Sequence, residues 1–245
     1  MREYRLPLDM SNPGQFFACC GLFEIADLAS GGSNAWFERD EPAFVINTPE
    51  ILPPQSMSLC DATGDVDDLK LETLDLCIAS HRLTLNWWRN ETETDKSVLK
   101  TWGGQQTPRR VLGELLGLLE SGCPFAKLFE TYVYTESRFG VDSRSAWEAI
   151  DAGYSPTDEN QRARTFPWVE VLAVIGLQGF RPEPSSSSKF RQRYNVWLEP
   201  LTLTSARAAV AAALGGLKTV TFEFEIAPRG QGYKTFLSAK GADHV

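Results

Sequence analysis

The chain has 245 residues, of which 42% are hydrophobic and 23% are charged, a composition typical of a globular protein with a sizeable core. It contains no run of about 18 apolar residues, and its first residues lack the apolar segment of a secretory signal, so we expect a cytoplasmic protein without membrane contact. Its net charge of −8 argues against a free-standing nucleic-acid-binding protein, because contacts to phosphate need basic residues.

The negative charge is unevenly distributed along the chain. Residues 1–100 contain 8 Lys and Arg and 17 Asp and Glu, a net of −9, whereas residues 101–245 contain 16 and 15, a net of +1. The second part can therefore add a local basic patch to a larger assembly.

The first elements are predicted in the order strand, helix, strand, strand. Residues 2–9 alternate in polarity and include a proline, which suits an edge strand. Ser11 or Asn12 can cap a helix that ends near Gly31. Residues 35–47 then read as two strands around a turn.

The five cysteines show no pattern of a disulfide or metal site, and we expect all of them to be unpaired packing residues. Cys19 and Cys20 are neighbours in the predicted helix, with Cα atoms ~3.8 Å apart, whereas a usual disulfide needs about 4.4–6.8 Å. Cys60, Cys77 and Cys123 are scattered without C-x-x-C spacing. We therefore expect no metal ion and no cofactor.

The later elements are helices and strands in alternation. Hydrophobic spacing predicts helices over residues 108–122, 144–153, 166–180 and 205–217. Alternating polarity predicts strands over residues 71–80, 81–88, 219–227 and 233–239. Residues 181–197 contain a serine run and are predicted to form a flexible loop.

These elements place the chain in the α+β class, with a mixed or antiparallel sheet, and we treat residues 1–245 as one domain. Residues 1–104 and 218–245 are predicted to form the sheet, and residues 105–217 to be mainly helical. If the opening strands and the closing hairpin share one sheet, the arrangement is RRM-like with a helical insertion.

No pattern in the sequence indicates a catalytic centre. The chain has no nucleophile elbow, phosphate-binding loop or metalloprotease motif. Its two histidines are His81, beside a predicted hairpin turn, and His244. We therefore expect a protein that is not an enzyme, and a ribonuclease with His81 as general base is the enzymatic alternative.

The first unusual segment, residues 100–110, combines cationic, aromatic and amide side chains at a predicted helix N-terminus. Arginines at a helix N-terminus are unfavourable for helix stability, because their positive charge lies at the positive end of the helix dipole. A helix N-terminus with basic and amide side chains nearby can instead bind phosphate. A tryptophan in the same segment can stack on a base. The competing interpretation is a surface turn with the tryptophan in the core. The candidate nucleic-acid-binding residues of this segment are Lys100, Trp102, Gln105, Gln106, Arg109 and Arg110.

The second unusual segment interleaves basic and aromatic residues around the serine run, a pattern that suits a nucleic-acid strand. If the segment is a strand, its alternate basic residues face one side together. The competing interpretation is a solvated strand face. The candidate nucleic-acid-binding residues of this segment are Arg181, Lys189, Phe190, Arg191 and Arg193.

Several segments together resemble one protein family. They are NPGQFFACCGLFEIADLA, LKTWGGQQTPRRVL, RFGVDSRSAWEAIDAGYSP and PWVEVLAVIGLQGFRP, which lie between residue 12 and residue 182. As a set they are similar to the small CRISPR-associated protein of type I-U (also called I-G) systems, in the Csb group. That family is regarded as a candidate large-subunit component of the Cascade interference complex.

The resemblance implies a non-catalytic role in binding CRISPR RNA and target double-stranded DNA. Large subunits of such complexes contact the protospacer-adjacent motif and help to open the duplex, while base pairing reads the sequence. The implied partners are CRISPR RNA, target DNA, the backbone and RNA-end-binding subunits, and a recruited helicase-nuclease. The acidic first part departs from a basic DNA clamp and favours contact with basic partner subunits. A purely structural subunit that bridges protein partners is the alternative.

Overall fold

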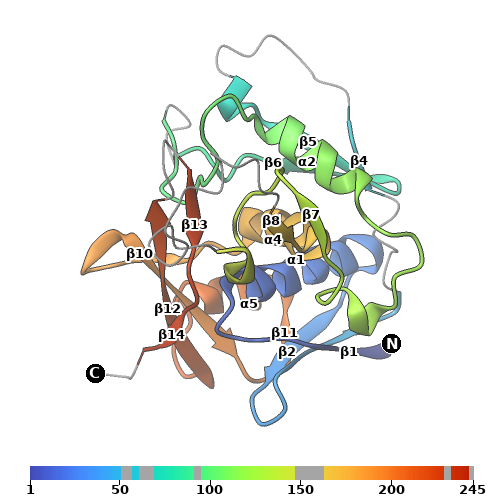
Figure 1. The fold of residues 1–245 in the computed structure, drawn as a ribbon. Helices are drawn as coiled ribbons and strands as arrows, with labels where there is room; N and C mark the ends of the chain where they lie inside the picture. Colours follow the sequence, from blue (N-terminus) through green and yellow to red (C-terminus); the bar gives the residue numbers. More distant parts are fainter. Residues whose placement is uncertain (51–56, 61–68, 91–94, 147–162, 229–232, 243–245) are drawn as a thin grey trace.

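The computed structural model describes residues 1–50, 57–60, 69–90, 95–146, 163–228 and 233–242, and Figure 1 shows its ribbon. Its α-helices are α1 (Pro13–Ser30), α2 (Pro108–Gly117), α4 (Pro167–Gly179) and α5 (Leu203–Val210). Short 3-10 turns cover Leu69–Leu71, Phe125–Lys127 and Ser143–Ser145. Together with the antiparallel sheets described next, these helices confirm the predicted α+β class.

Two larger sheets contain most of the described strands. The four-stranded sheet has the order β1-β3-β2-β11 and consists of β1 (Arg2–Pro7), β2 (Asn34–Glu38), β3 (Ala43–Thr48) and β11 (Leu201–Thr202). The five-stranded sheet consists of β9 (Glu183–Ser185), β10 (Ser188–Trp197), β12 (Thr219–Pro228), β13 (Lys234–Phe236) and β14 (Lys240–Gly241). The first strand lies at a sheet edge, as its sequence predicts.

Two smaller sheets complete the described strands. The three-stranded sheet has the order β4-β5-β6 and consists of β4 (Met57–Leu59), β5 (Leu74–Ile78) and β6 (His81–Leu85). The predicted hairpin of β5 and β6 is thereby confirmed. The two-stranded ribbon pairs β7 (Val133–Thr135) with β8 (Ala163–Thr165).

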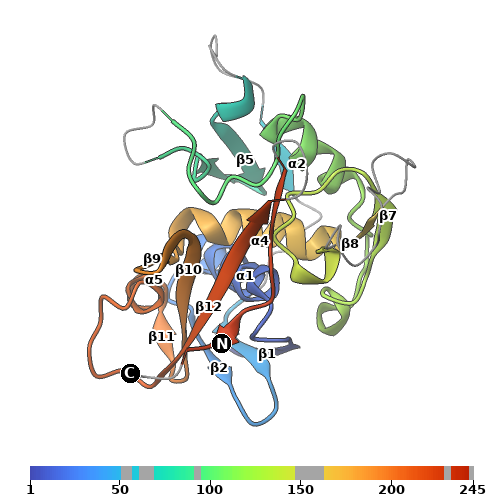
Figure 2. The same cartoon turned by 60° about the vertical axis from the view of Figure 1, so that its left-hand side comes forward.

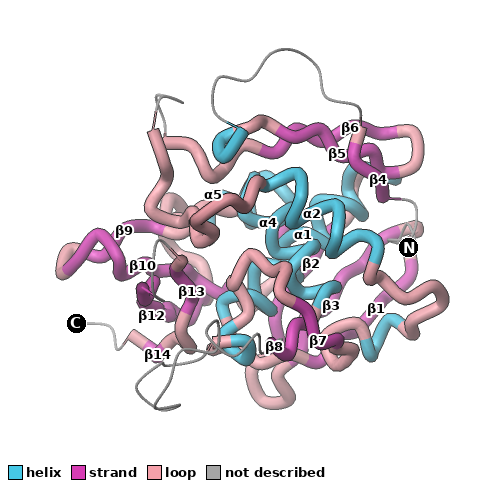
Figure 3. The backbone as a smooth tube through the Cα atoms, turned by 45° about the horizontal axis from the view of Figure 1, so that its top comes forward, coloured by secondary structure: helices cyan, strands magenta, loops and turns pink. Residues whose placement is uncertain are grey.

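The helices α1 and α4 lie side by side at the centre of the molecule (Figure 1). The four-stranded sheet covers them below, α2 and the β4–β6 sheet lie above, and the long strands β10 and β12 run along one side (Figures 1 and 2). Figure 3 shows the same arrangement from another direction, with the helices enclosed by strands and loops. Strands are therefore spread over the outside of a helical centre.

Capping groups define the ends of α1. The side chain of Asn12 accepts hydrogen bonds from the backbone N–H groups of Gly14 and Gln15, at 3.0 and 3.3 Å. Pro13 lacks an N–H and occupies the first turn, where no donor is needed. The helix stops at Gly31, whose φ of 63° suits glycine. Local chemistry thus sets this helix, as predicted.

The crossing of α1 and α4 depends on two glycines. A Cβ atom at Gly21 would meet the carbonyl oxygen of Leu172, and one at Gly176 would meet the carbonyl oxygen of Phe17. The two backbones therefore touch directly, which explains how both helices can be buried against each other.

Stacked aromatic rings connect α1 to both larger sheets. The ring of Phe16 lies 4.4 Å from that of Tyr194 in β10 and 5.3 Å from that of Phe37 in β2, measured between centroids. Trp197 contacts Phe37 edge to face at 4.8 Å. The Tyr194 hydroxyl donates to the carbonyl of Met10 at 2.7 Å. Buried rings of this size contribute much of the core's stability.

The RRM-like expectation of a single sheet is wrong. The opening strands β1, β2 and β3 pair with β11, whereas the closing hairpin of β12 and β13 pairs with β10 in a separate sheet. Residues 105–217 contain helices but also the strands β7 to β11. The reason is that β12 pairs antiparallel with β10 over Arg191–Trp197, a long-range pairing that local patterns do not specify.

The predicted flexible loop over residues 181–197 is also wrong, because this segment is the β9–β10 hairpin. Its serine run forms the turn between the two strands. The predicted helix over residues 205–217 is shorter than expected, since α5 ends at Val210 and Ala212 has a φ of 48°. The predicted helix over residues 144–153 lies largely outside the described residues.

The expectation for the cysteines holds for three of them and is wrong for two. Cys19, Cys20 and Cys123 are free thiols, and burial raises the pKa of Cys19 and Cys20 well above its usual range. Cys60 and Cys77 form a disulfide with Cα atoms 5.8 Å apart. The antiparallel pairing of β4 and β5 brings these two residues together, and their spacing in the sequence does not reveal it.

Within the described ranges, no helix is both long enough and apolar enough to cross a bilayer.

Candidate nucleic-acid interface

Two of the predicted binding residues lie in the core. Trp102 is 2% exposed, and its ring lies 5.8 Å from Trp87, 5.5 Å from Trp88 and 5.2 Å from Phe139. The Lys100 ammonium is buried, donates to the Trp102 carbonyl at 2.5 Å and lies 4.6 Å from the centre of the Trp102 ring. A buried ring cannot stack on a base, so these two residues serve packing, which is the competing interpretation of their segment.

The arginines at the start of α2 have protein partners. Arg109 donates to Glu72 at 2.6 Å and to the Cys60 carbonyl at 3.1 Å, which fastens α2 to the β4–β6 sheet. Arg110 is 67% exposed and pairs with Glu114, one helical turn later, at 2.9 Å. An exposed ion pair of this kind contributes little stability, so Arg110 can leave Glu114 to bind an anion. Of the two arginines, Arg110 is therefore the one available to a ligand.

The remaining members of the first segment and Arg181 offer little to a ligand. Gln105 is exposed, whereas Gln106 is half-buried. The cap of α2 is occupied by Thr107, whose side chain accepts from the backbone N–H of Arg110 at 3.2 Å. Arg181 donates to the carbonyl of Trp87 at 2.9 Å, and burial lowers the pKa of its guanidinium.

The basic residues of β10 share one exposed face, as the strand interpretation predicts. Arg191 lies 3.7 Å from each of Glu223 and Glu225, and Arg193 lies 2.9 Å from Glu223. The hydrogen bonds from Arg193 and then Ser185 lower the pKa of Glu223. The neighbouring strand β12 therefore neutralises the middle of this face, and its excess positive charge lies nearer the turn.

Near that turn, two lysines flank an exposed aromatic ring. Phe190 is 39% exposed, and the ammonium groups of Lys189 and Lys234 lie 5.2 and 5.9 Å from its ring centre. Lys234 also donates to the Val98 carbonyl at 2.8 Å. In the part of the chain that the structure describes, every ion pair has an arginine as its cation. Neither of the two lysines therefore has a described carboxylate within 4.0 Å.

The two lysines also affect each other. Burial, and then the charge of Lys189, lowers the pKa of Lys234. An anion placed between these lysines would offset their repulsion, so the site suits a phosphate. Beside the ring an open hollow of about 500 Å³ is lined by Ser187, Ser188, Phe190, Arg191, Glu225, Ile226 and Pro228. We call Lys189, Phe190, Lys234 and this hollow the hairpin site.

A second cluster of arginines and aromatic rings lies at the β7–β8 ribbon, and the sequence analysis did not include it. Arg164 lies 4.1 Å from the ring centre of Tyr132 and 4.9 Å from that of Phe166. Arg144 lies 3.4 Å from the centre of Phe166. The spacing of Tyr132 and Tyr134, two positions apart, is the sequence signal that could have indicated it. The pairing of Tyr134 with Arg164 and the contact of Tyr132 with Arg164 are visible only in three dimensions.

Comparisons with known proteins add no further assignment. The chain matched no protein-family model, and searches of curated proteins and of solved structures gave no match.

Proposed function

We propose that this protein is a non-catalytic, nucleic-acid-binding subunit of a type I-U CRISPR interference complex. The proposal combines the family resemblance of the segments between residues 12 and 182 with one structural observation, the exposed Phe190 ring flanked by Lys189 and Lys234. A ring beside two cations matches a nucleotide, because the base can stack while the phosphate meets the ammonium groups. In this proposal the hairpin site contacts the target DNA or the CRISPR RNA.

The proposal assigns this chain the partners of such a complex. They are CRISPR RNA, target double-stranded DNA, the backbone and RNA-end-binding subunits, and the recruited helicase-nuclease, all in the cytoplasm. The subunit would help to recognise the protospacer-adjacent motif and to open the duplex, while the guide RNA reads the sequence. The acidic residues 1–100, with a net charge of −9, suit contact with basic partner subunits.

A double variant at the hairpin site tests the proposal. We expect Lys189→Gln with Phe190→Ala to weaken target-DNA binding by the reconstituted complex roughly tenfold or more, because a stacking contact and a phosphate contact are both lost. Electrophoretic mobility shift with purified complex measures the effect.

The matched control is Lys218→Gln, which removes the same charge at another exposed position. We expect this variant to bind target DNA as the unaltered complex does. If the double variant assembles with the other subunits and binds target DNA with unchanged affinity, the hairpin site is not the contact. That outcome would favour the purely structural bridging role, for which the neutralised face of β10 and β12 would be suitable.

A further inference from the structure

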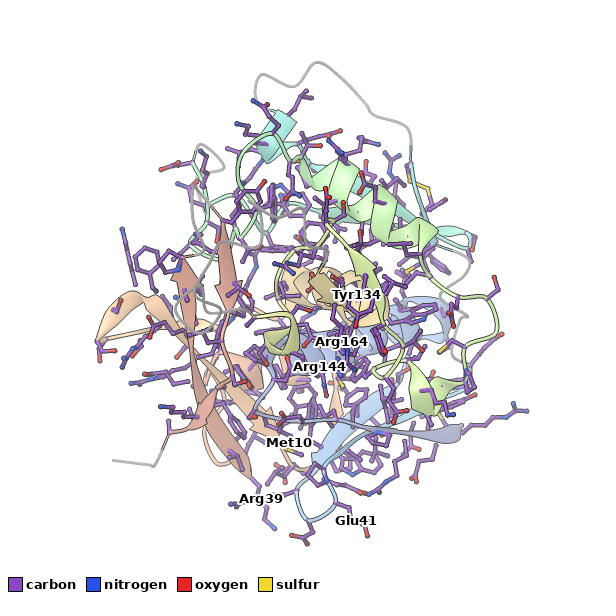
Figure 4. The ribbon with its side chains drawn as sticks, viewed as in Figure 1. Met10, Arg39, Glu41, Tyr134, Arg144 and Arg164 are labelled. Carbon is purple, nitrogen blue, oxygen red and sulfur yellow. A yellow bond between two sulfur atoms is a disulfide. The ribbon has the colours of Figure 1, made fainter. Side chains whose placement is uncertain are left out.

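The β7–β8 ribbon exposes aromatic and cationic side chains on one face. Tyr134 and Arg164 are directly opposite each other in the antiparallel pairing, so their side chains point to the same side. Tyr132 precedes Tyr134 by two positions and lies on that side as well, with the two ring centres 5.8 Å apart. Figure 4 shows Tyr134 and Arg164 on the near side of the molecule, above Arg144.

The Arg164 guanidinium is held by rings and not by acids. It lies over Tyr132 at 4.1 Å and near Phe166 at 4.9 Å. Over the described ranges it has no carboxylate within 4.0 Å, and the hydrogen bonds found there leave its N–H groups without an acceptor. The stacking fixes the plane of the group, while its N–H edge stays free to bind an anion such as phosphate.

The support beneath this face is anchored in the core. Phe166 is buried, and Arg144 stacks on it with 3.4 Å between the guanidinium carbon and the ring centre. Arg144 is fixed by Asp142 at 2.7 Å and by the Phe129 carbonyl at 2.8 Å. Asp142 in turn accepts from the Asn12 side chain at 2.7 Å. The stack is therefore organised before any ligand arrives, which lowers the entropic cost of binding.

The exposed end of the stack offers flat aromatic surface. Tyr134 is 61% exposed and Tyr132 is 45% exposed. Glu136, the acidic residue that follows β7, has its charge near Arg110 and, after Glu114, contributes to raising the pKa of that arginine. A flat, partly apolar and cationic surface of this kind matches a ligand that alternates planar rings with negative charges.

We infer that the β7–β8 ribbon is a stacking site for single-stranded nucleic acid, with a base on Tyr134 and the adjoining phosphate at Arg164. In a duplex the base faces are covered by their neighbours, so the site selects unpaired strands. The inference rests on the nucleic-acid-binding function proposed above for its biological setting, but it uses a surface separate from the hairpin site. Single-stranded DNA and RNA share the chemistry that the site recognises.

Fluorescence anisotropy with the full chain tests the inference, using labelled oligo(dU), oligo(rU) and a duplex of mixed sequence as probes. We expect Tyr134→Ala to weaken binding of the single strands roughly fivefold to a hundredfold, and Tyr134→Phe to keep it, because the ring and not the hydroxyl carries the contact. The slope of log affinity against log salt is negative, and we expect Arg164→Gln to reduce its magnitude by about 0.7 and Arg164→Lys to leave it unchanged. A preference between the two single strands reports whether the 2′-hydroxyl is read.

The hairpin variant Lys189→Gln with Phe190→Ala is measured in the same titration to separate the two proposals. Loss of binding only in the ribbon variants supports the inference and argues against the hairpin site. Loss only in the hairpin variant overturns the inference and leaves the proposed function standing. Unchanged binding in folded Tyr134→Ala and Arg164→Gln proteins, no binding by the unaltered chain, or equal binding of the duplex would each overturn the inference.

Discussion

At the scale of single residues, the fold changes the protonation of the buried carboxylate of Glu170. Its oxygens accept from the backbone N–H groups of Phe139 at 2.7 Å, Gly140 at 2.9 Å and Asp142 at 3.3 Å. Burial, and then the charge of Asp142, raises the pKa of Glu170 to about 7. The hydrogen bonds only partly offset these two effects.

This pKa makes the stability depend on pH. An unfolded chain has an ordinary glutamate with a pKa near 4.5, so between that value and about 7 the folded state binds more protons. Folding stability therefore decreases as the pH rises through this window, and above it Glu170 is ionised in both states, so the loss is complete. The direction is opposite to that of a carboxylate whose pKa the fold lowers.

The substitution Glu170→Gln tests this effect, because the amide keeps an acceptor oxygen but does not ionise. Between about pH 5 and about pH 8, we expect the unaltered protein to lose about 2–3 kcal/mol of unfolding free energy relative to the variant. Urea denaturation at both pH values measures the difference. A parallel pH dependence in the two proteins would show that Glu170 is ionised throughout.

At the scale of elements, the contact of α1 with α4 has no room for a side chain at its closest point. We expect Gly176→Ala to lower the free energy of unfolding by about 2–4 kcal/mol or to prevent folding, because the added methyl group meets the backbone of Phe17. Gly117→Ala is the matched control, since Gly117 is also helical but has nothing within 4 Å of the added atom.

The control should raise stability by about 0.5–1 kcal/mol, because alanine is the better helix former. Chemical denaturation followed by tryptophan fluorescence measures both variants. Equal stability of the two variants would contradict the direct backbone contact between α1 and α4.

The disulfide between Cys60 and Cys77 joins the end of β4 to β5 and closes a loop with a sequence separation of 17. A loop of this length gives about 3 kcal/mol in the chain-entropy estimate, so we expect a comparable loss of unfolding free energy on reduction. Alkylation of the denatured, unreduced protein should modify three of the five cysteines, and all of them after reduction.

The variant Cys60→Ser with Cys77→Ser controls for effects of the reductant, since its stability should not respond to it. Five reactive thiols before reduction would show that the bridge is absent in the isolated protein. Without the bridge, the hydrogen-bonded pairing of β4 with β5 would still connect the two strands.

At the scale of the whole molecule, both proposed contacts with nucleic acid lie in the part of the chain with the higher proportion of basic residues. The hairpin site and the β7–β8 ribbon belong to residues 101–245, which have a net charge of +1, whereas residues 1–100 have −9. The charge asymmetry agrees with our proposal, in which residues 101–245 contact the nucleic acid and residues 1–100 contact partner subunits.

Much of the fold could be predicted because it depends on neighbouring residues. The cap at Asn12, the stop at Gly31, the hairpin of β5 and β6 and the helix α4 all follow from local chemistry and periodicity. Of the candidate site, the sequence indicated the shared face of β10 and the exposed Phe190 beside Lys189. These features could be predicted because the side chains of one strand point alternately to its two faces.

The tertiary structure decided the features that depend on pairing between distant residues. Burial removed Trp102 and Lys100 from the candidate interface, because the Trp102 ring packs among distant aromatic rings. Glu72 engages Arg109, a contact that forms only when α2 packs on the β4–β6 sheet. The placement of Tyr134 opposite Arg164 likewise requires a strand pairing across about thirty residues, which no local pattern encodes. The sequence by itself thus determined the helices α1, α2 and α4 and the β5–β6 hairpin, which depend on local chemistry. The long-range packing determined the β9–β10 hairpin and decided which charged and aromatic side chains remain exposed for binding.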